Sequence, residues 1–355
     1  MRRLIMNRKI LSPVILGVLV FALALPLAAQ PDDFQMLSIT EDGKYFKCRY
    51  DVTYWESGED FIYLSFYYYP WSGEDSIDYS IAYKLLEVNG KIVGVNLVER
   101  EAETVVDKSG IITAQVDSDN IDDLVQFPNL IAVSVVGATE EDLAKLSNYD
   151  NLRAIDLAYT KITNDGLAGL AELPELRVLN LSYTKVSDEG LQYLSELENL
   201  RSINLESTEI TNDGLAYLEG LDELRHLNLF RTPAGKMEAL VMRGQPYKVG
   251  DAGTFSLSRM DKLTELNLHG SDITDDGIDQ LVSMTNLRFL DLSATKITDA
   301  SIQELSKMNN LRYLDIKGTE ITTAGLKRLR NALPDCEINF YSGSLTKDRR
   351  GLLKP

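Results

Sequence analysis

Two histidines, His226 and His269, are the only histidines available for acid–base or metal chemistry in this chain. The repeat frame described below places them in adjacent rows but four positions apart along the strands, roughly 13 Å. That separation excludes a shared metal ion and a direct proton relay. The chain also lacks HExxH, CxxC, GxSxG and GxxxxGK[ST] motifs, so the familiar hydrolase, zinc and nucleotide signatures are missing.

Carboxylates are abundant, but their spacing distinguishes no catalytic pair. The 54 Asp and Glu residues could supply a glycosidase-type pair, although nothing singles one out. Segments such as Asn164-Asp165 and Asp188-Glu189 superficially resemble calcium loops, yet none completes the spaced oxygens and distant Glu of that motif. We therefore predict a protein that is not an enzyme and holds no cofactor or metal ion.

The histidines belong to a stretch, from Asn151 to about Leu333, that aligns with itself in rows of 24 residues. Each row reads LxxLxLxxT, then Ile or Val two residues on, a T/S-[ND]-x-G segment and LxxLxxL. A fixed period of about 20 to 30 residues indicates a solenoid. The rows begin at Asn151, Glu175, Asn199, Glu223, Lys262, Asn286 and Asn310.

Each row predicts one strand and one helix. Ile155 and Leu157 alternate as in a strand, whereas Leu167, Leu170 and Leu173 recur at the spacing of one helical face. Burying the apolar side chains of one row stabilises it by about 10 to 20 kcal/mol. Ordering its backbone costs about 1 to 2 kcal/mol per residue, so a single row cannot fold alone. The rows must stack, with strands about 4.8 Å apart in a parallel sheet.

This pattern resembles the leucine-rich-repeat family, specifically its members with a helix on the outer face. Ribonuclease-inhibitor-like and F-box-associated proteins are of this kind, and exported bacterial proteins with 24-residue TD-x-GL repeats are the most similar. The resemblance covers roughly half of the chain. It implies an α/β solenoid with a parallel β-sheet on the concave face and helices on the convex face, and it indicates fold far more than function.

Residues 1–29 have the layout of a secretory signal peptide, with a basic start, an apolar run from Ile10 to Leu27 and two alanines before Gln30. We predict cleavage near Ala29 and a secreted, periplasmic or cell-surface protein. The alternative is an uncleaved membrane anchor, because the apolar run is nearly long enough to span a bilayer.

The charge of the chain limits the classes of partner that we expect, and its cysteine content bears on disulfide bonds. The net charge is −18, and residues 31–355 carry −22 because residues 1–30 hold four basic residues and no acidic ones. This acidity opposes binding to nucleic acid or anionic membranes. The two cysteines, Cys48 and Cys336, are interpreted as buried thiols and not as a disulfide.

Residues 30–107 predict a small antiparallel β unit. Phe46–Tyr54 alternates apolar and polar residues, and Phe61–Tyr69 is an aromatic, β-favouring run. The aromatic cluster could bind sugars or peptides, or could serve the core of the unit. Asn89-Gly90 indicates a hairpin between Ile81–Val88 and Lys91–Glu99. A helix over Tyr79–Val88 is the alternative there.

The array is expected to be closed at both ends. Residues 108–150 look like degenerate N-terminal capping repeats, with entry strands at Ile112–Val116 and Leu130–Val135. Residues 334–355 should form a C-terminal cap strand, from about Leu333 to Phe340, followed by a basic tail.

Three columns of the array have structural explanations. The first holds hydroxyl residues at the turn after the strand, which can bind backbone groups: Thr160, Thr184, Thr208, Thr232, Ser271, Thr295 and Thr319. The second holds expected helix N-caps: Thr163, Ser187, Thr211, Thr274, Thr298 and Thr322. The third holds glycines at a close-packing position, which Ser301 also occupies: Gly166, Gly190, Gly214, Gly253, Gly277 and Gly325.

Recognition is expected on the strand residues that point away from the core. A uniform Asp/Asn column there should serve the scaffold: Asp156, Asn180, Asn204, Asn228, Asn267, Asp291 and Asp315. The two columns beside it vary and contain aromatic and basic residues of the types that contribute binding energy. The predicted binding residues in and beside them are Tyr159, Tyr183, His226, Phe230, Arg231, His269, Phe289 and Tyr313. The alternative is that these are the ordinary aromatics of an exposed sheet.

An insertion of residues 233–247 breaks the 24-residue period beside Phe230 and Arg231. Insertions in solenoids often emerge on the binding face. Its apolar residues are costly to expose unless they fold back or meet a partner, so Met237, Leu240 and Met242 complete the predicted binding patch. The alternative is a passive loop that packs on the flank of the array.

The resulting hypothesis is a non-catalytic, exported protein–protein or peptide interaction module that binds through its concave face. The partner is a protein or peptide and not nucleic acid, and a membrane is involved only if residues 1–29 remain attached. The first alternative is a structural or cell-surface component that uses the repeats as a spacer. A remoter one is a substrate-recognition adaptor like the F-box-associated proteins.

Overall fold

The computed structural model describes residues 37–41, 44–54, 62–69, 85–88, 91–96, 108, 113–230, 249–340, 346–347 and 353–354. The chain divides into two compact units, residues 1–83 and 84–355, which are treated separately here. The predicted signal peptide and the 233–247 insertion lie outside the described residues.

The first unit is a three-stranded antiparallel sheet, as the alternating sequence predicts. Strand β1 (Leu37–Glu41) pairs with β2 (Lys44–Tyr54), which pairs along its length with β3 (Ile62–Tyr69). The proposal that its aromatic residues form a binding surface stays a prediction.

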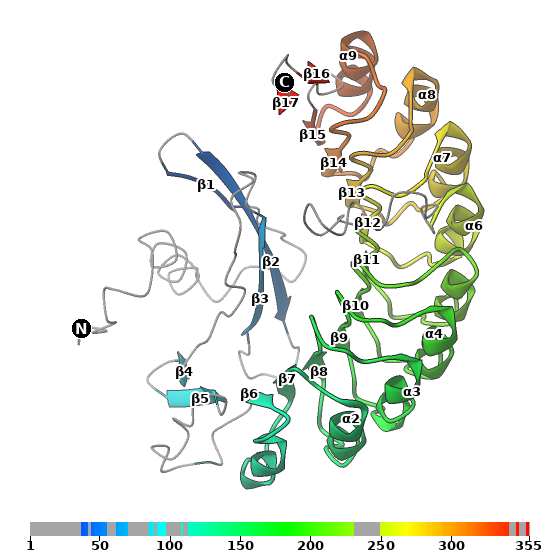
Figure 1. Cartoon of the computed structure of the whole chain (residues 1–355). Coiled ribbons are helices and arrows are strands. Elements are labelled where there is room, and N and C mark those ends of the chain that lie inside the picture. The colour runs from blue at the N-terminus through cyan, green and yellow to red at the C-terminus, as the bar shows by residue number, and fades with distance from the viewer. Residues whose placement is uncertain are drawn as a thin grey trace. The chain divides into compact units, whose positions relative to one another are not determined.

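The second unit contains one open 12-stranded sheet in the order β15 to β4. Strands β5 to β15 run parallel in chain order, and Figure 1 shows β7 to β15 along the inner side of an arc. The strands are β4 (Leu85–Val88), β5 (Lys91–Asn96), β6 (Thr113–Asp117), β7 (Ala132–Val136), β8 (Ala154–Asp156), β9 (Val178–Asn180), β10 (Ser202–Asn204), β11 (His226–Asn228), β12 (Glu265–Asn267), β13 (Phe289–Asp291), β14 (Tyr313–Asp315) and β15 (Glu337–Asn339). The predicted leucine-rich-repeat solenoid is therefore confirmed.

The N-terminal end of the sheet begins with β4 and β5, which the sequence analysis placed in the separate β unit of residues 30–107. Strands β4 and β5 pair antiparallel, so the described part of the predicted hairpin is confirmed and the helix alternative is wrong at Leu85–Val88. Both strands extend the sheet of the repeats through β6. The domain boundary predicted near residue 107 falls among residues that are not described. At the other end β15 adds to β14, and a short pair, β16 (Thr346–Lys347) and β17 (Leu353–Lys354), follows.

Short helical segments return the chain on the outer side of the arc (Figure 1). The α-helices are α2 (Glu140–Leu146), α3 (Asn164–Leu167), α4 (Asp188–Leu194), α6 (Asp251–Arg259), α7 (Asp275–Leu281), α8 (Ile302–Leu305) and α9 (Thr323–Ala332). The 3₁₀ segments are η3 (Ile121–Gln126), η4 (Leu170–Glu172), η5 (Gly214–Leu218) and η6 (Asp299–Ser301). One helical segment per row was predicted, but the row from Asn199 has a 3₁₀ turn in place of an α-helix.

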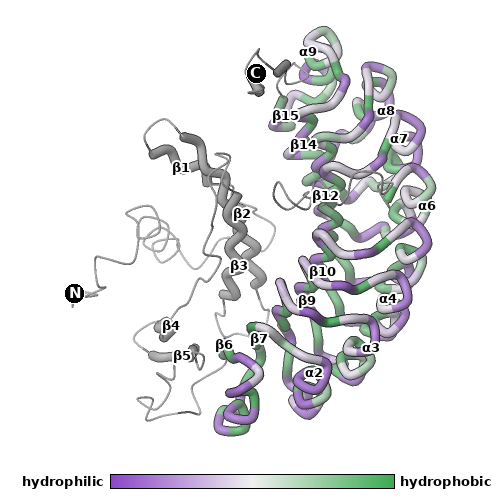
Figure 2. The backbone as a smooth tube through the Cα atoms, in the orientation of Figure 1, coloured by the Kyte–Doolittle hydropathy of each residue, from purple (hydrophilic) through white to green (hydrophobic). Residues whose placement is uncertain are grey.

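A continuous hydrophobic core fills the space between strands and helical segments, from Ala114 to Ile338. Apolar and polar stretches alternate along every row in Figure 2. Cys336 is half-buried against this core, and burial raises the pKa of its thiol to about 11. No helix among the described residues is long and apolar enough to cross a bilayer.

Consecutive rows are joined by an Asp or Asn at or near the start of each helical segment. Asp275 Oδ1 accepts from the Thr298 backbone N–H at 2.8 Å, and Asp275 Oδ2 accepts from Thr298 Oγ1 at 2.7 Å. The equivalent backbone bonds join Asn164 to Ser187, Asp188 to Thr211, Asn212 to Gly250, Asp251 to Thr274 and Asp299 to Thr322. These carboxylates and amides therefore act between rows, which the sequence pattern did not indicate.

The glycine column makes room for these side chains. A Cβ added at Gly190 or Gly253 would lie 2.6 Å from Oδ1 of Asn164 or Asn212, respectively. In the row where Ser301 replaces glycine, its Oγ donates a hydrogen bond to Asp275. The close-packing prediction for the glycine column is confirmed. The packed group is an Asp or Asn of the preceding row at every position except Gly166, where a Cβ would first meet Glu140 and Ile162 at 3.2 Å.

The N-cap predictions are confirmed only in part. Thr274, Thr298 and Thr322 are N-caps whose Oγ1 accepts a backbone N–H of the first turn. Thr163 and Ser187 occupy the N-cap position without that bond. Thr211 is wrong, because the N-cap of η5 is Asp213. The N–H and hydroxyl of Thr211 bind Asp188 of the preceding row, and the helical segment starts three residues later, at Gly214.

Candidate functional site

The candidate site is the face of the sheet that points away from the core, called here the strand face. It consists of three columns, and the pairing register confirms the first two of them residue by residue. The first column is Ala154, Val178, Ser202, His226, Glu265, Phe289 and Tyr313. The third follows directly after the strands and is Ala158, Ser182, Glu206, Phe230, His269, Ser293 and Lys317.

The second column, of Asp and Asn, builds the turn that ends each strand. In all seven rows its Oδ1 accepts the backbone N–H two residues later, from Asp156 to Asp315, at 2.9 to 3.1 Å. The hydroxyl column supports the same turn, since Thr160 Oγ1 donates to the Leu157 carbonyl and its five described counterparts make the equivalent bond. Both columns serve the scaffold, as the sequence predicted.

The residue after the third column has a left-handed backbone wherever it is described. Its φ is +60° at Tyr159 and +58° at Tyr183, and Ser207, Gly270, Ala294 and Gly318 share this conformation. Left-handed backbone costs a residue with a Cβ about 1 to 2 kcal/mol. Two consecutive rows therefore carry tyrosine at a position where glycine folds more easily.

These two tyrosines form a stacked pair at the end of the strands. Their ring centroids are 4.3 Å apart and the planes differ by 11°. Tyr183 Oη donates to Glu206 Oε1 at 2.9 Å, and Tyr159 remains 51% exposed. Of the predicted binding residues, these two meet each other directly after the third column, and Tyr159 is the most exposed aromatic residue among the predicted ones that are described.

The other aromatic residues of the strand face pack in two further pairs. Phe230 lies against His269 with centroids 4.4 Å apart, and Phe289 stacks on Tyr313 at 4.7 Å with an interplanar angle of 4°. Phe230, Phe289 and Tyr313 are each at most 7% exposed. Adjacent rows therefore bury these rings against one another, and the role of the three residues in partner binding stays a prediction.

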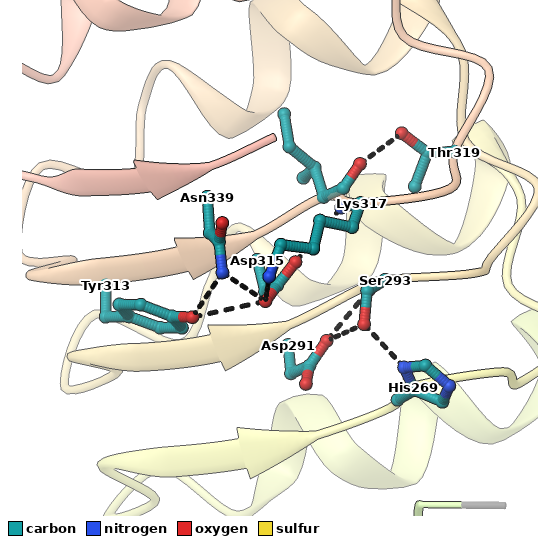
Figure 3. Close-up of polar contacts among 9 residues, drawn as sticks. His269, Asp291, Ser293, Tyr313, Asp315, Lys317, Thr319 and Asn339 are labelled. Carbon is teal, nitrogen blue, oxygen red and sulfur yellow. Dashed lines mark hydrogen bonds and ion pairs between the residues drawn. The ribbon is translucent and has the colours of Figure 1, made fainter. Parts of the chain in front are cut away.

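Polar side chains of β13 and the following turn link His269 to a carboxylate (Figure 3). His269 Nδ1 lies 2.6 Å from Ser293 Oγ, which donates its proton to Asp291 Oδ1. Because that hydroxyl has one proton, it accepts from Nδ1–H of the neutral imidazole. Both hydrogen bonds that Asp291 receives from Ser293 end at Oδ1.

The neighbouring row forms a second polar group around Asp315 (Figure 3). Asp315 Oδ2 accepts from Tyr313 Oη at 3.1 Å and from Asn339 Nδ2 at 2.9 Å. Lys317 Nζ lies 3.8 Å from the same oxygen. The only lysine in these columns is therefore already paired with a carboxylate.

Burial dominates the electrostatics of this polar group. It lowers the pKa of His269, although Asp291 and Asp315 oppose the shift. Burial and the charge of Asp315 raise the pKa of Asp291. Burial, with Asp315, raises the pKa of the Tyr313 hydroxyl far above its ordinary value. At neutral pH the histidine is held neutral and the ionised form of Asp291 is disfavoured relative to water.

The arrangement does not match nucleophilic catalysis. A hydrolytic triad places histidine between the serine and the carboxylate, whereas Ser293 lies between His269 and Asp291 here. Ser293 is also buried. The second histidine, His226, lies 3.7 Å from Glu265 Oε1 and is not part of the His269–Ser293–Asp291 series of hydrogen bonds. Within the described residues, no group of three or more His, Cys, Asp or Glu side chains could hold a metal ion.

An arginine column at the start of the strands escaped the sequence analysis. In successive rows each Arg donates its backbone N–H to the carbonyl of the residue before it in the column, as Arg177 does to Arg153 at 2.8 Å. The column is Arg153, Arg177, Arg201, Arg225, Thr264, Arg288 and Arg312. Burial and the neighbouring Arg201 and Arg153 lower the pKa of Arg177. In the 24-residue alignment these arginines stand one position before the first column, so the repeated arginine was visible in the sequence.

Sequence reasoning also missed an aromatic stripe on the helical side. Tyr193, Tyr217 and Phe255 lie on consecutive helical segments and are exposed, Phe255 by 57%. The remaining predicted binding residues, Arg231, Met237, Leu240 and Met242, lie outside the described residues, so their place in the patch is a proposal.

Comparison with known proteins supports the repeat assignment. A family model described as "Leucine rich repeat" matches residues 261–321, and a second of the same description matches residues 151–171, 173–195 and 196–218. No curated protein sequence matches the chain.

Two solved internalin structures from Listeria monocytogenes str. 4b F2365 are similar to this chain. Internalin C2 is 20% identical, over 66% of this chain and 82% of that one, with a TM-score of 0.38. An internalin named inlF is 14% identical, over 66% and 76% of the two chains, with a TM-score of 0.42. The family matches and the stacked rows, each a parallel strand backed by a helical segment, identify residues 151–218 and 261–321 as leucine-rich repeats.

Proposed function

We propose that this protein is an exported, non-catalytic module that binds a protein or peptide through the strand face of its leucine-rich repeats. The division of labour among the columns carries the proposal. The second column and the hydroxyl column form the turns, and the core is filled from the opposite face. The first and third columns take no part in these turns, so their residue types can differ from row to row, as a recognition surface requires.

The residues in those columns and directly after the third one are of types that contribute binding energy. Tyr159 combines an exposed ring with a rigid stack on Tyr183, and such aromatic anchors are enriched among residues that dominate interfaces. His226 is half-exposed beside Glu265 in the middle of the face. We include Arg231 and the 233–247 insertion in the same patch, because the insertion leaves the array directly after Phe230.

Export is part of the proposal and rests on the basic start and apolar run of residues 1–29. The finer likeness to exported bacterial TD-x-GL repeats supports the same compartment. A structural spacer in the cell envelope is the competing function, and it requires no specific ligand on the strand face.

Affinity capture from the cell envelope separates these functions. The mature chain, carrying an affinity tag at its C-terminus, is expected to retain a discrete partner at fixed stoichiometry, identified by mass spectrometry. Recovery of only wall material or of further copies of this chain would favour the spacer.

A pair of matched variants then locates the binding face. Tyr159→Ser removes an exposed ring from the strand face, and Tyr193→Ser removes one from α4 on the helical side. Partner recovery should fall with Tyr159→Ser and stay unchanged with Tyr193→Ser. The reverse result would move recognition to the helical side.

Deletion of residues 234–247 tests whether the insertion belongs to the binding patch. Unchanged binding by a folded array would remove the insertion from the patch.

A further inference from the structure

Exposed apolar surface lies at the turns that follow β7 and β8. Val136, the last residue of β7, is 46% exposed, and Tyr159 is exposed in the next row. Gly137 follows Val136 at the position that corresponds to Tyr159, because β7 and β8 pair in register and both residues have left-handed backbone. A Cβ added at Gly137 would meet no atom within 4 Å. Since Tyr183 stacks on one face of the Tyr159 ring, the other face is turned toward this open space.

The exposed tyrosine is not required by the turn that carries it. Glycine occupies the equivalent left-handed position at Gly137, Gly270 and Gly318, where the backbone folds without strain. Tyr159 keeps a strained backbone and an exposed ring, and its stack on Tyr183 holds that ring in one orientation. Strain that surrounding structure maintains is characteristic of functional positions. The ring is therefore interpreted as a contact for a ligand.

Two lysines lie beside the stacked tyrosines. Lys161 and Lys185 are exposed and stand two residues after Tyr159 and Tyr183, with a buried threonine between each tyrosine and its lysine. Tyrosine and lysine therefore share the exposed side of the turn in both rows. The Lys185 N–H donates to the Ile162 carbonyl at 3.1 Å, which places the two lysines in adjacent loops.

These lysines differ from the other lysine of their column in having no acidic partner. Lys296, at the same position in the row from Asn286, pairs with Asp272 of the preceding row. Within the part of the chain that the structure describes, the ammonium groups of Lys161 and Lys185 form no ion pair. Two adjacent, unneutralised lysines thus form a local basic site in a protein that is otherwise strongly acidic.

We propose that the partner of the strand face is a protein or peptide that packs an apolar side chain on Tyr159 and directs a neighbouring carboxylate to Lys161 and Lys185. This inference rests on the proposed function and adds the chemistry of the partner. The apolar side chain would lie over Gly137 and against Val136, where both exposed side chains lose contact with water.

Charge complementarity supports this occupant and fixes its orientation. The two lysines attract a carboxylate, whereas Asp117 pairs with Val136 in the sheet and repels a carboxylate at that end. Glu209 follows Lys185 in the next row, so the positive charge is confined to two residues. A single Asp or Glu beside an apolar residue therefore fits better than an acidic run, which the net charge of the protein repels.

The test is titration of the full mature chain, isotope-labelled, with defined peptides followed by NMR. The probe is acetyl-Ser-Phe-Asp-Ser-amide, which should shift the backbone amide signals of residues 136–138, 159–162 and 183–186. Its affinity should fall about threefold when Lys replaces Asp, because exposed ion pairs contribute modestly, and about tenfold when Ser replaces Phe, because an aromatic contact is lost.

Matched variants assign these effects to the tyrosine and the lysines. Tyr159→Gly installs the residue that other rows use at this position, so the fold is retained, and affinity should fall about tenfold. Lys161→Gln and Lys185→Gln should each weaken binding about threefold. Lys296→Gln changes the same column in a row without tyrosine and should bind as the unaltered chain does. Circular dichroism checks that each variant is folded.

Three results would overturn the inference. Equal affinity for the Asp and Lys peptides, or equal effects of Lys161→Gln and Lys296→Gln, would exclude the lysines as the carboxylate site. Tighter binding of an oligogalacturonate than of the Phe-Asp peptide, lost in Tyr159→Gly, would make the partner an acidic sugar. Absence of peptide binding would exclude the site altogether.

Capture of the native partner separates these results from failure of the proposed function. If Tyr159→Ser still reduces partner recovery while Lys161→Gln and Lys185→Gln do not, the strand face binds its partner and only the acidic contact is wrong. A captured partner that is indifferent to all three changes would contradict the function of the strand face as well.

Discussion

Single glycines set the distance between rows at the helical side of this protein. Gly190 leaves the space into which Asn164 of the preceding row extends, and the side chain of Asn164 then accepts the backbone N–H of Ser187. One atom at the glycine position therefore affects both packing and a hydrogen bond between rows. In another row Ser301 replaces the glycine. Its hydroxyl donates a hydrogen bond to the Asp275 carboxylate of the preceding row, which explains why serine is tolerated there.

We predict that Gly190→Ala lowers the free energy of unfolding by about 1 to 3 kcal/mol, as overpacking does elsewhere. The new Cβ would lie 2.6 Å from Asn164 Oδ1, so the row must shift or the hydrogen bond must break. Urea unfolding followed by circular dichroism measures the change. Gly220→Ala is the control, because a Cβ there meets no atom within 4 Å, and its stability should be unchanged or slightly higher. Equal effects of the two changes would contradict this account.

His269 should make the stability of the array depend on pH. Burial lowers its pKa in the folded state, so folding favours the neutral imidazole. The stabilisation is therefore fully present above the ordinary histidine pKa of about 6.5 and is lost as the pH falls below that value. We expect the free energy of unfolding to fall between about pH 7.5 and 5.5, and to fall less in His269→Gln. Parallel pH profiles of the two proteins would contradict the prediction.

Residue types alone predicted the turns of the strand face but not every partner. Each Asp or Asn of the second column binds within its own row, two residues away, so the sequence contains both partners. The N-cap residues behaved differently. Thr211 was predicted to cap its own helix, but η5 begins only at Gly214 and its N-cap is Asp213. Thr274 and Thr298 make the same contact with the preceding row and do cap their helical segments, so the residue type at this position does not decide where the segment begins.

At the scale of elements, the acidic residues at the start of the helical segments connect neighbouring rows. Asp275 accepts hydrogen bonds from the backbone and hydroxyl of Thr298 and from the hydroxyl of Ser301. Burial acts to raise the pKa of Asp275, but these hydrogen bonds outweigh it and lower the pKa. The ionised form is thus favoured by folding, and the row contact is strongest when the carboxylate is charged.

Asp275→Ala should lower the free energy of unfolding by about 1 to 3 kcal/mol at neutral pH, because three donors lose a charged acceptor. A carboxylate with a lowered folded pKa stabilises the protein above its ordinary pKa and loses that effect as the pH falls through the folded value. The difference between the variant and the unaltered chain should therefore shrink below about pH 4. Asp276→Ala, at the exposed neighbouring position, is the control for urea titrations at both pH values. A difference that persists unchanged in acid would contradict the account.

Element boundaries were predictable where the 24-residue frame is regular and less so elsewhere. Strands β8 to β14 lie at the repeated LxxLxL positions because alternating burial fixes them. The helical segments were less determined, since the four to seven residues available in most rows can form α- or 3₁₀-turns of similar stability. The predicted binding residues Phe230, Phe289 and Tyr313 were placed in the correct columns. Their burial depended on stacking between rows, which the pattern did not specify.

At the scale of the whole molecule, stability should be distributed over the rows. Each row contacts only its neighbours, and one core runs through all of them. An array of this kind tolerates loss of a complete unit, because the flanking rows present the same side chains to one another. It does not tolerate loss of part of a unit, which places core residues on the wrong face.

Deletion of residues 175–198 removes one complete row and joins Pro174 to Asn199 in frame. We expect a folded array whose urea m-value is lower by about a tenth, because proportionally less surface is exposed on unfolding. Deletion of residues 175–186 is the matched half-row control and should abolish cooperative unfolding. Loss of structure in both deletions would contradict a fold built from interchangeable rows.

The left-handed position after the third column has a consequence for how this surface could change over time. Gly270 and Gly318 occupy it without a side chain, whereas Tyr159 and Tyr183 place an aromatic ring there at some expense in backbone energy. No core residue depends on the choice. Replacing glycine with tyrosine at this site thus lowers the folding stability and enlarges the contact area in one substitution, and the reverse replacement does the opposite. Each repeat can thus change the side chain that it presents by one substitution, and the Tyr159–Tyr183 stack shows that neighbouring repeats can combine such side chains into a larger contact surface.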